Sequence, residues 1–166
     1  MSYDVTIRRL GPAALLDLRG EPEAVASWLA YLGMTLPETP NTATRAGRRE
    51  LYWLGPTHWI LRAPIDSEDD LLESLKKEDL PPDICQVLVT DAFAWFEISG
   101  PDAAQILAIA SPLDLHPSTF PPNGATFTEA FGLKALIIKH DHGAELAVER
   151  SFGDMTADYL DRVTGA

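Results

Sequence analysis

The chain has 166 residues, of which 46% are hydrophobic and 23% charged, so its composition is that of a folded globular protein and excludes a disordered one. Its 25 acidic and 13 basic residues give a formal net charge of −12, and a field of that sign repels nucleic acid and anionic membranes. Neither is therefore an expected partner.

The single cysteine and the N-terminal segment bear on the cellular compartment. Cys85 has no second cysteine to pair with, and its place in the apolar run 84–89 predicts a buried strand thiol. The segment MSYDVTIRRLG lacks the apolar core of a signal peptide, and no run approaches the roughly eighteen apolar residues of a membrane span. We expect a cytoplasmic protein.

The first half of the chain is predicted to alternate strands with two helices. Pro22 opens the first helix and Gly33 closes it, and its buried stripe at i, i+3, i+4 and i+7 runs from Val25 to Leu32. Ser67 is expected to cap the second helix, and the segment from Met34 to Gly47 is predicted to be a loop. The strands are expected at Val5–Leu10, Ala13–Arg19, Arg48–Leu54, His58–Ala63, Ile84–Thr90 and Ala92–Ile98.

The second half repeats this order of elements. A helix follows Pro101, presents Ala103, Ile106, Leu107 and Ala110 on one face, and must end at Ser111 because Pro112 disfavours helical geometry there. Strands are expected at Ala125–Phe131, Leu133–His140 and Glu145–Glu149. A last helix, Phe152–Val163, is expected to carry Phe152, Met155, Tyr159, Leu160 and Val163 on one side.

The repetition predicts the fold class. We expect one domain over residues 1–166, built from two pseudo-repeats at about 13–90 and 92–163. Two βαββα units of this length favour an α+β fold, in which antiparallel strands curve into a sheet or barrel with the helices outside.

The sequence carries no recognisable catalytic motif, phosphate-binding glycine loop or zinc motif. Asp114 and His116 fit either an acid-base pair or a turn in which a side chain bonds loop backbone. His140 and His142 are compatible with a metal pair or with a polar hairpin tip. The basic cluster at 45–49 would hold an anion or be solvated. We therefore expect no catalytic, cofactor-binding or metal-binding residue on this chain.

A stiff apolar loop follows the helix that ends at Ser111. Its prolines, at 112, 117, 121 and 122, fall within eleven residues and are interleaved with apolar side chains. Such a loop is usually packed against a surface. The run SPLDLHP, the hairpin LYWLGPTHWIL and the segment VERSF together resemble the gamma subunit of heterotetrameric sarcosine oxidase from about Leu16 to Val163. Ser111 stands where that family often has cysteine, so no role of a thiol there carries over.

The resemblance implies a subunit that is not catalytic by itself. The fold would be similar to the aminomethyltransferase folate-binding fold. In the family, the alpha subunit carries NAD and a folate site, the beta subunit carries FAD and covalent FMN, and the delta subunit binds zinc. The complex oxidises sarcosine with oxygen and passes the one-carbon unit to tetrahydrofolate. This chain would scaffold the flavin-bearing subunits through the loop residues Pro112, Leu113, Leu115, His116, Pro117, Phe120 and Pro121.

Two alternatives stay open at this point. The chain would be a free-standing folate-binding or aminomethyltransferase-like protein, although such enzymes are longer. It would otherwise serve as the gamma-like subunit of another amine-oxidising complex.

Overall fold

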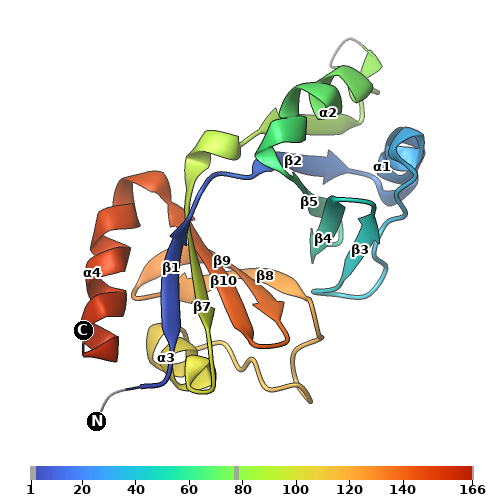
Figure 1. The fold of residues 1–166 in the computed structure, drawn as a ribbon. Coiled ribbons are helices and arrows are strands. Elements are labelled where there is room, and N and C mark those ends of the chain that lie inside the picture. The colour runs from blue at the N-terminus through green and yellow to red at the C-terminus, as the bar shows by residue number, and fades with distance from the viewer. Residues whose placement is uncertain (1–2, 77–78, 166) are drawn as a thin grey trace. The chain divides into compact units, whose positions relative to one another are not determined.

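A computed structural model describes residues 3–76 and 79–165 and divides the chain into two compact units. The mid-chain unit spans Ala13–Thr90, and the terminal unit joins Met1–Pro12 to Asp91–Ala166. Each unit contains a five-stranded antiparallel sheet and its own hydrophobic core (Figure 1). The α+β class with antiparallel strands is thus confirmed, whereas the duplication itself stays a prediction.

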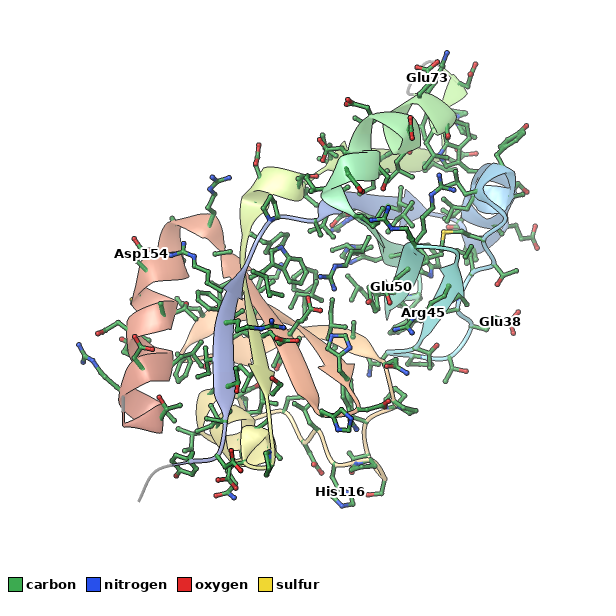
Figure 2. The ribbon with its side chains drawn as sticks, in the orientation of Figure 1. Glu38, Arg45, Glu50, Glu73, His116 and Asp154 are labelled. Atoms are coloured by element: carbon green, nitrogen blue, oxygen red, sulfur yellow. The ribbon has the colours of Figure 1, made fainter. Side chains whose placement is uncertain are left out.

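The terminal unit has the strand order β1-β7-β10-β9-β8, and helices α3 (Ala103–Ala110) and α4 (Gly153–Thr164) contact β7 and β10. Its strands are β1 Thr6–Leu10, β7 Phe93–Ser99, β8 Ala125–Ala130, β9 Leu133–His140 and β10 Gly143–Glu149. At one end of the sheet, Arg9 of β1 pairs with Asp154 at the start of α4, with Nη1 2.6 Å from Oδ1 (Figure 2). Both side chains are exposed, so the pair adds little to stability.

The mid-chain unit has the strand order β3-β4-β5-β2-β6. Its strands are β2 Ala14–Gly20, β3 Ala43–Ala46, β4 Arg49–Gly55, β5 His58–Ala63 and β6 Ile84–Leu88. Its helices are α1 (Pro22–Leu29), extended by the 3-10 turn η1 (Ala30–Leu32), and α2 (Glu68–Ser74). The 3-10 turn η2 (Ile65–Ser67) also lies in this unit and η4 (Thr90–Ala92) begins at its last residue, whereas η5 (Arg150–Phe152) belongs to the terminal unit.

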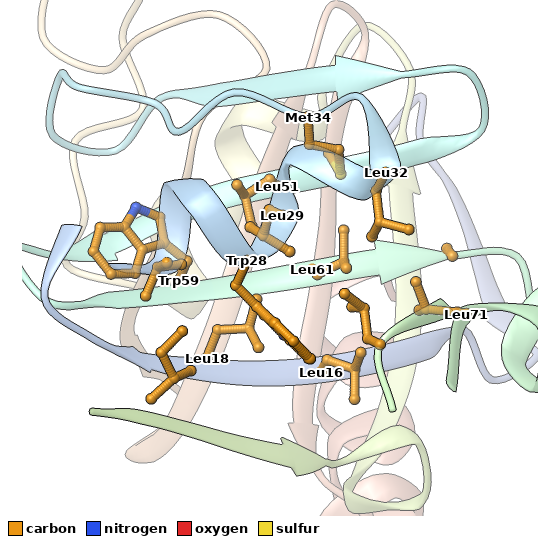
Figure 3. Packing of buried hydrophobic residues seen from close by; sticks show 14 of the residues in the cluster. Leu16, Leu18, Trp28, Leu29, Leu32, Met34, Leu51, Trp59, Leu61 and Leu71 are labelled. Carbon is orange, nitrogen blue, oxygen red and sulfur yellow. The ribbon is translucent and has the colours of Figure 1, made fainter. Parts of the chain in front are cut away.

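Helix α1 covers the core of the mid-chain unit (Figure 3). Its stripe Val25, Trp28, Leu29 and Leu32 is buried, as the periodicity predicted. Trp28 also donates its indole N–H to Oε1 of Gln86 on β6, at 3.1 Å. Gly33 closes the helical segment with a φ of +65°, a conformation that glycine adopts without steric cost.

Helix α3 plays the corresponding part in the terminal unit. All four predicted stripe residues, Ala103, Ile106, Leu107 and Ala110, are buried. The helix ends where Pro112 requires it to end, because Ser111 already has extended backbone geometry. The prediction for helix α4 is confirmed only in part. Leu160 is buried, but Phe152 lies before the helix, in η5, and is 38% exposed, so its assignment to the helix is wrong.

Three further predictions are corrected. The segment from Met34 to Gly47 is not all loop, since it contains β3, which pairs with β4 from Ala43 opposite Tyr52 onward. The Ser67 hydroxyl donates to the Pro64 carbonyl at 2.7 Å and makes no cap bond to α2. The Cys85 thiol is exposed, because β6 is an edge strand and Cys85 faces away from the core.

The edge formed by β6 is apolar and open. Val87 is 48% exposed and Leu88 43% exposed. The N–H of Val89 bonds the Leu15 carbonyl at 2.9 Å, so by strand alternation Gln86 and Leu88 turn their backbone N–H and C=O groups away from β2. Within β6 the sequence has no lysine and no proline, which are common protections of such edges.

Candidate functional site at the proline-rich loop

The loop from Pro112 to Pro121 leaves the end of α3 and returns to β8. Ser111, at its start, is buried, and its hydroxyl accepts the N–H of Leu113 at 3.3 Å. Because Pro112 cannot donate a backbone hydrogen bond, this contact gives the chain its first fixed point after the helix. The loop therefore starts from a rigid position.

Asp114 and His116 shape the loop. Oδ1 of Asp114 accepts the backbone N–H of His116 at 2.9 Å, and Nδ1 of the His116 ring accepts the backbone N–H of Ser118 at 3.2 Å. The His116 carbonyl in turn accepts the N–H groups of Thr119 and Phe120, both at 2.9 Å. Each side chain thus bonds nearby backbone, which is the loop-shaping interpretation and not the acid-base one.

The side chains of the loop divide into a group that packs inward and a group that is exposed. Leu113 and Leu115 are half-buried against the core of the terminal unit, and Phe120 is buried. Pro112, His116 and Pro117 are exposed, and Figure 2 shows His116 at the tip of the loop. A contact with a partner protein, which stays a prediction, would therefore rest on the exposed group.

Lys139 of β9 fastens the far end of the loop. Its Nζ donates to the Phe120 carbonyl at 3.0 Å, and its backbone N–H donates to the Gly124 carbonyl at 2.8 Å. A hydrogen bond from a charged donor is stronger than one from a neutral donor. The loop is thus held at its start by Ser111 and at its far end by Lys139.

A cavity of about 590 Å³ lies between the loop, α3 and the β9–β10 hairpin. Two of its lining residues are glycines that another segment of the backbone approaches closely. A Cβ on Gly143 (φ +151°) would lie 1.9 Å from the Ile98 carbonyl oxygen, and one on Gly100 (φ +121°) would lie 2.8 Å from the Asp4 oxygen. Neither position accepts a larger residue without a backbone shift.

The other polar clusters form ordinary side-chain hydrogen bonds and ion pairs. Nε2 of His140 lies 3.0 Å from Oε1 of Glu145, and the described residues contain no group of three or more side chains able to hold a metal. In the basic cluster, Arg45 pairs with Glu50 at 2.8 Å (Figure 2), and Arg48 pairs with Asp66 at 3.3 Å. These contacts fit the solvated interpretation of the arginines.

Removing the Asp114 carboxylate should loosen the loop. The His116 N–H, followed by the Thr119 side chain, holds the pKa of Asp114 below its ordinary value of 3.8. A lowered folded-state pKa means that the stabilisation is present at neutral pH and is lost as the pH falls through that pKa. In Asp114→Ala, we expect amide hydrogen exchange at His116 and Thr119 to be about three- to tenfold faster at neutral pH.

The matched control for this measurement is Glu129→Ala on β8, an exposed carboxylate outside the loop. It should leave the exchange of both amides unchanged. Unchanged exchange in Asp114→Ala as well would mean that the prolines alone fix the loop.

The comparisons with known proteins agree with this architecture. The family model described as "Sarcosine oxidase, gamma subunit family" matches residues 19–165. A chain of the heterotetrameric sarcosine oxidase from Corynebacterium sp. U-96, solved with pyrrole 2-carboxylate, is 25% identical with a TM-score of 0.83, over 97% of this chain and 84% of that one. No curated protein matches the chain.

A second solved structure extends the likeness of the fold. The glycine cleavage system aminomethyltransferase T from Bartonella henselae is 14% identical with a TM-score of 0.64, over 96% of this chain and 46% of that one. In the described residues, no helix is long and apolar enough to cross a membrane. Because the family model matches nearly the whole length of the chain, the chain belongs to the sarcosine oxidase gamma subunit family.

Proposed function

We propose that this chain is the non-catalytic gamma subunit of a cytoplasmic heterotetrameric sarcosine oxidase, assembled with alpha, beta and delta subunits. The observation that carries the proposal is the match to the gamma family over residues 19–165. The high TM-score with a chain of a heterotetrameric sarcosine oxidase supports the assembly with other subunits.

In this proposal the chemistry belongs to the partner subunits. FAD, FMN, NAD, zinc and tetrahydrofolate would be held there, and this chain would keep the flavin-bearing subunits in position for sarcosine oxidation and one-carbon transfer. The bonding of Asp114 and His116 to loop backbone supports a structural role, because side-chain bonds to nearby backbone are typical of residues that shape a turn.

Co-expression with the gene that encodes a flavin-bearing partner subunit, followed by size-exclusion chromatography, tests the assembly. We expect the chain to elute with its partners in one high-mass peak that carries flavin absorbance. If the chain elutes alone as a stable monomer and retains no partner, the proposal is wrong.

The loop contact can be tested at Pro117, which is exposed at the tip. Pro117→Glu adds a charge that a partner's apolar surface would have to desolvate, so we expect at least tenfold weaker retention of the partner subunits. The melting temperature of the isolated chain should shift by less than about 2 °C, because the residue is exposed.

Pro122→Glu is the control for that experiment. Pro122 is also exposed and lies just beyond the loop residues expected to touch the partner. Equal losses of retention in both variants would point to a general effect of charge and not to a contact at the loop tip.

The fold likeness to the aminomethyltransferase favours a second candidate, a folate-binding protein that acts alone. This chain spans less than half of that enzyme, which speaks against independent activity. Calorimetry of the isolated chain with tetrahydrofolate separates the two, because only the second candidate requires tight binding.

A further inference from the structure

A second cavity, of about 790 Å³, lies within the mid-chain unit and plays no part in the proposed contact of the loop. Helix α1, the segment after Gly33 and the β4–β5 hairpin form its walls. The residues that give it its character are Trp53, Trp59, Pro22, Pro37, Pro40 and Pro56. Its volume lies in the range of natural binding pockets, and its lining is mostly apolar, with two tryptophans and four prolines among its residues. We refer to it as the tryptophan groove.

The two tryptophans stand opposite each other on β4 and β5. Trp53 is half-buried and presents ring surface, whereas Trp59 is only 2% exposed and lies next to α1 (Figure 3). The indole N–H of Trp59 has no hydrogen-bond partner in the described part of the chain. A buried donor without an acceptor is unfavourable, and such groups call for an explanation.

The rim of the groove is acidic. Glu23 comes from the first turn of α1 and Glu38 from the segment after Gly33; both side chains are exposed, and Figure 2 shows Glu38 at the surface. Neither carboxylate forms an ion pair with a described residue. An occupant with a positive charge is therefore favoured over a neutral or acidic one.

Aromatic side chains, an indole N–H that lacks an acceptor and nearby carboxylates are features with which proteins bind proline-rich segments. Prolyl rings pack on aromatic side chains, an indole N–H donates to a peptide carbonyl, and acidic residues select a flanking lysine or arginine. We propose that the tryptophan groove holds an extended, proline-containing segment of a partner subunit, with a basic residue next to the prolines. This inference rests on the proposed function, because it takes the occupant from the same complex.

The Trp59 nitrogen is covered in the free chain, so binding requires a small movement of the groove wall. A rigid extended peptide loses little conformational entropy on binding, which helps to offset this movement.

Photo-cross-linking in the co-expressed complex tests the inference. Ala30, an exposed residue on the groove wall, is replaced by benzoylphenylalanine, and the partner peptides that become attached are identified by mass spectrometry. We expect one dominant partner peptide, with at least about two prolines and a lysine or arginine within about six residues. The same photo-reactive residue at Glu129, exposed on β8, should not label that peptide.

Two variants address the chemistry of the groove. Glu38→Lys reverses a rim charge and should lower the cross-link yield at least fivefold, whereas Glu129→Lys, with the same net charge, should not change it. Trp59→Phe keeps an aromatic ring and loses the N–H. We therefore expect the cross-link yield to fall by about three- to tenfold.

The outcomes separate this inference from the proposed function. A complex that assembles normally but shows no cross-link from position 30, or attaches a segment without prolines, overturns the groove proposal alone. So does the recovery of a bound small molecule in place of a peptide. If the unsubstituted chain retains no partner subunit, the proposed function is wrong, and the groove proposal, which depends on it, is wrong as well.

Discussion

Trp28→Ala is expected to lower the free energy of unfolding of the isolated chain by about 3–5 kcal/mol. Trp28 is 7% exposed and contributes the largest side chain of the α1 stripe to the mid-chain core. The substitution leaves a cavity and also removes the donor that bonds Oε1 of Gln86 at 3.1 Å. Urea unfolding followed by far-UV circular dichroism measures the loss.

Tyr31→Ala is the matched control, because this aromatic residue lies in η1, the turn that extends α1, and is 83% exposed. Its loss should change the unfolding free energy by no more than about 0.5 kcal/mol. A loss under about 1 kcal/mol in Trp28→Ala would show that α1 does not pack on the sheet through this residue.

Gly143→Ala should destabilise the terminal unit by roughly 2–6 kcal/mol, the sum of backbone strain and overpacking. The added Cβ would lie 1.9 Å from the Ile98 carbonyl oxygen, and that atom belongs to the neighbouring strand β7. Strand β10 must therefore move away from β7, or the hairpin must change its conformation. Urea unfolding of the variant gives the magnitude.

Gly11→Ala controls for the change from glycine to alanine itself. A Cβ at Gly11 meets no atom within 4 Å, and this glycine does not have a positive φ. We expect a change of no more than about 0.5 kcal/mol. If Gly143→Ala is equally mild, the close approach of β10 to β7 is not needed for stability.

The helices that face a core could be predicted from the sequence. The stripes of α1 and α3 repeat every three to four residues, and this spacing alone places their members on one side of a helix. The end of α3 was equally predictable, because the restriction that Pro112 imposes on Ser111 is local.

Features that depend on tertiary pairing were missed. The sequence of β3, ATRA, has no apolar alternation and is a strand only because β4 pairs with it. Cys85 lies in an apolar run that is typical of a buried strand, yet β6 is an edge strand. Position in the sheet, which the sequence does not specify locally, decides whether such a residue is covered.

The candidate sites, too, could be predicted from the sequence only in part. The prolines located the loop at 112–121, but the inward direction of Leu113 and Leu115 follows from packing against the terminal core. The tryptophan groove gave no sequence signal, because it gathers residues from three segments between Pro22 and Trp59. Only the folded chain brings them together.

The open edge of β6 has a consequence for how the protein is made. Val87 and Leu88 are exposed beside backbone groups that point away from β2, and β6 contains no lysine or proline to discourage pairing with another copy. Edge-to-edge pairing grows with concentration, whereas folding of a single chain does not. A cell that produces this protein far in excess of what it assembles would therefore lose the surplus to aggregates, so balanced synthesis protects its solubility.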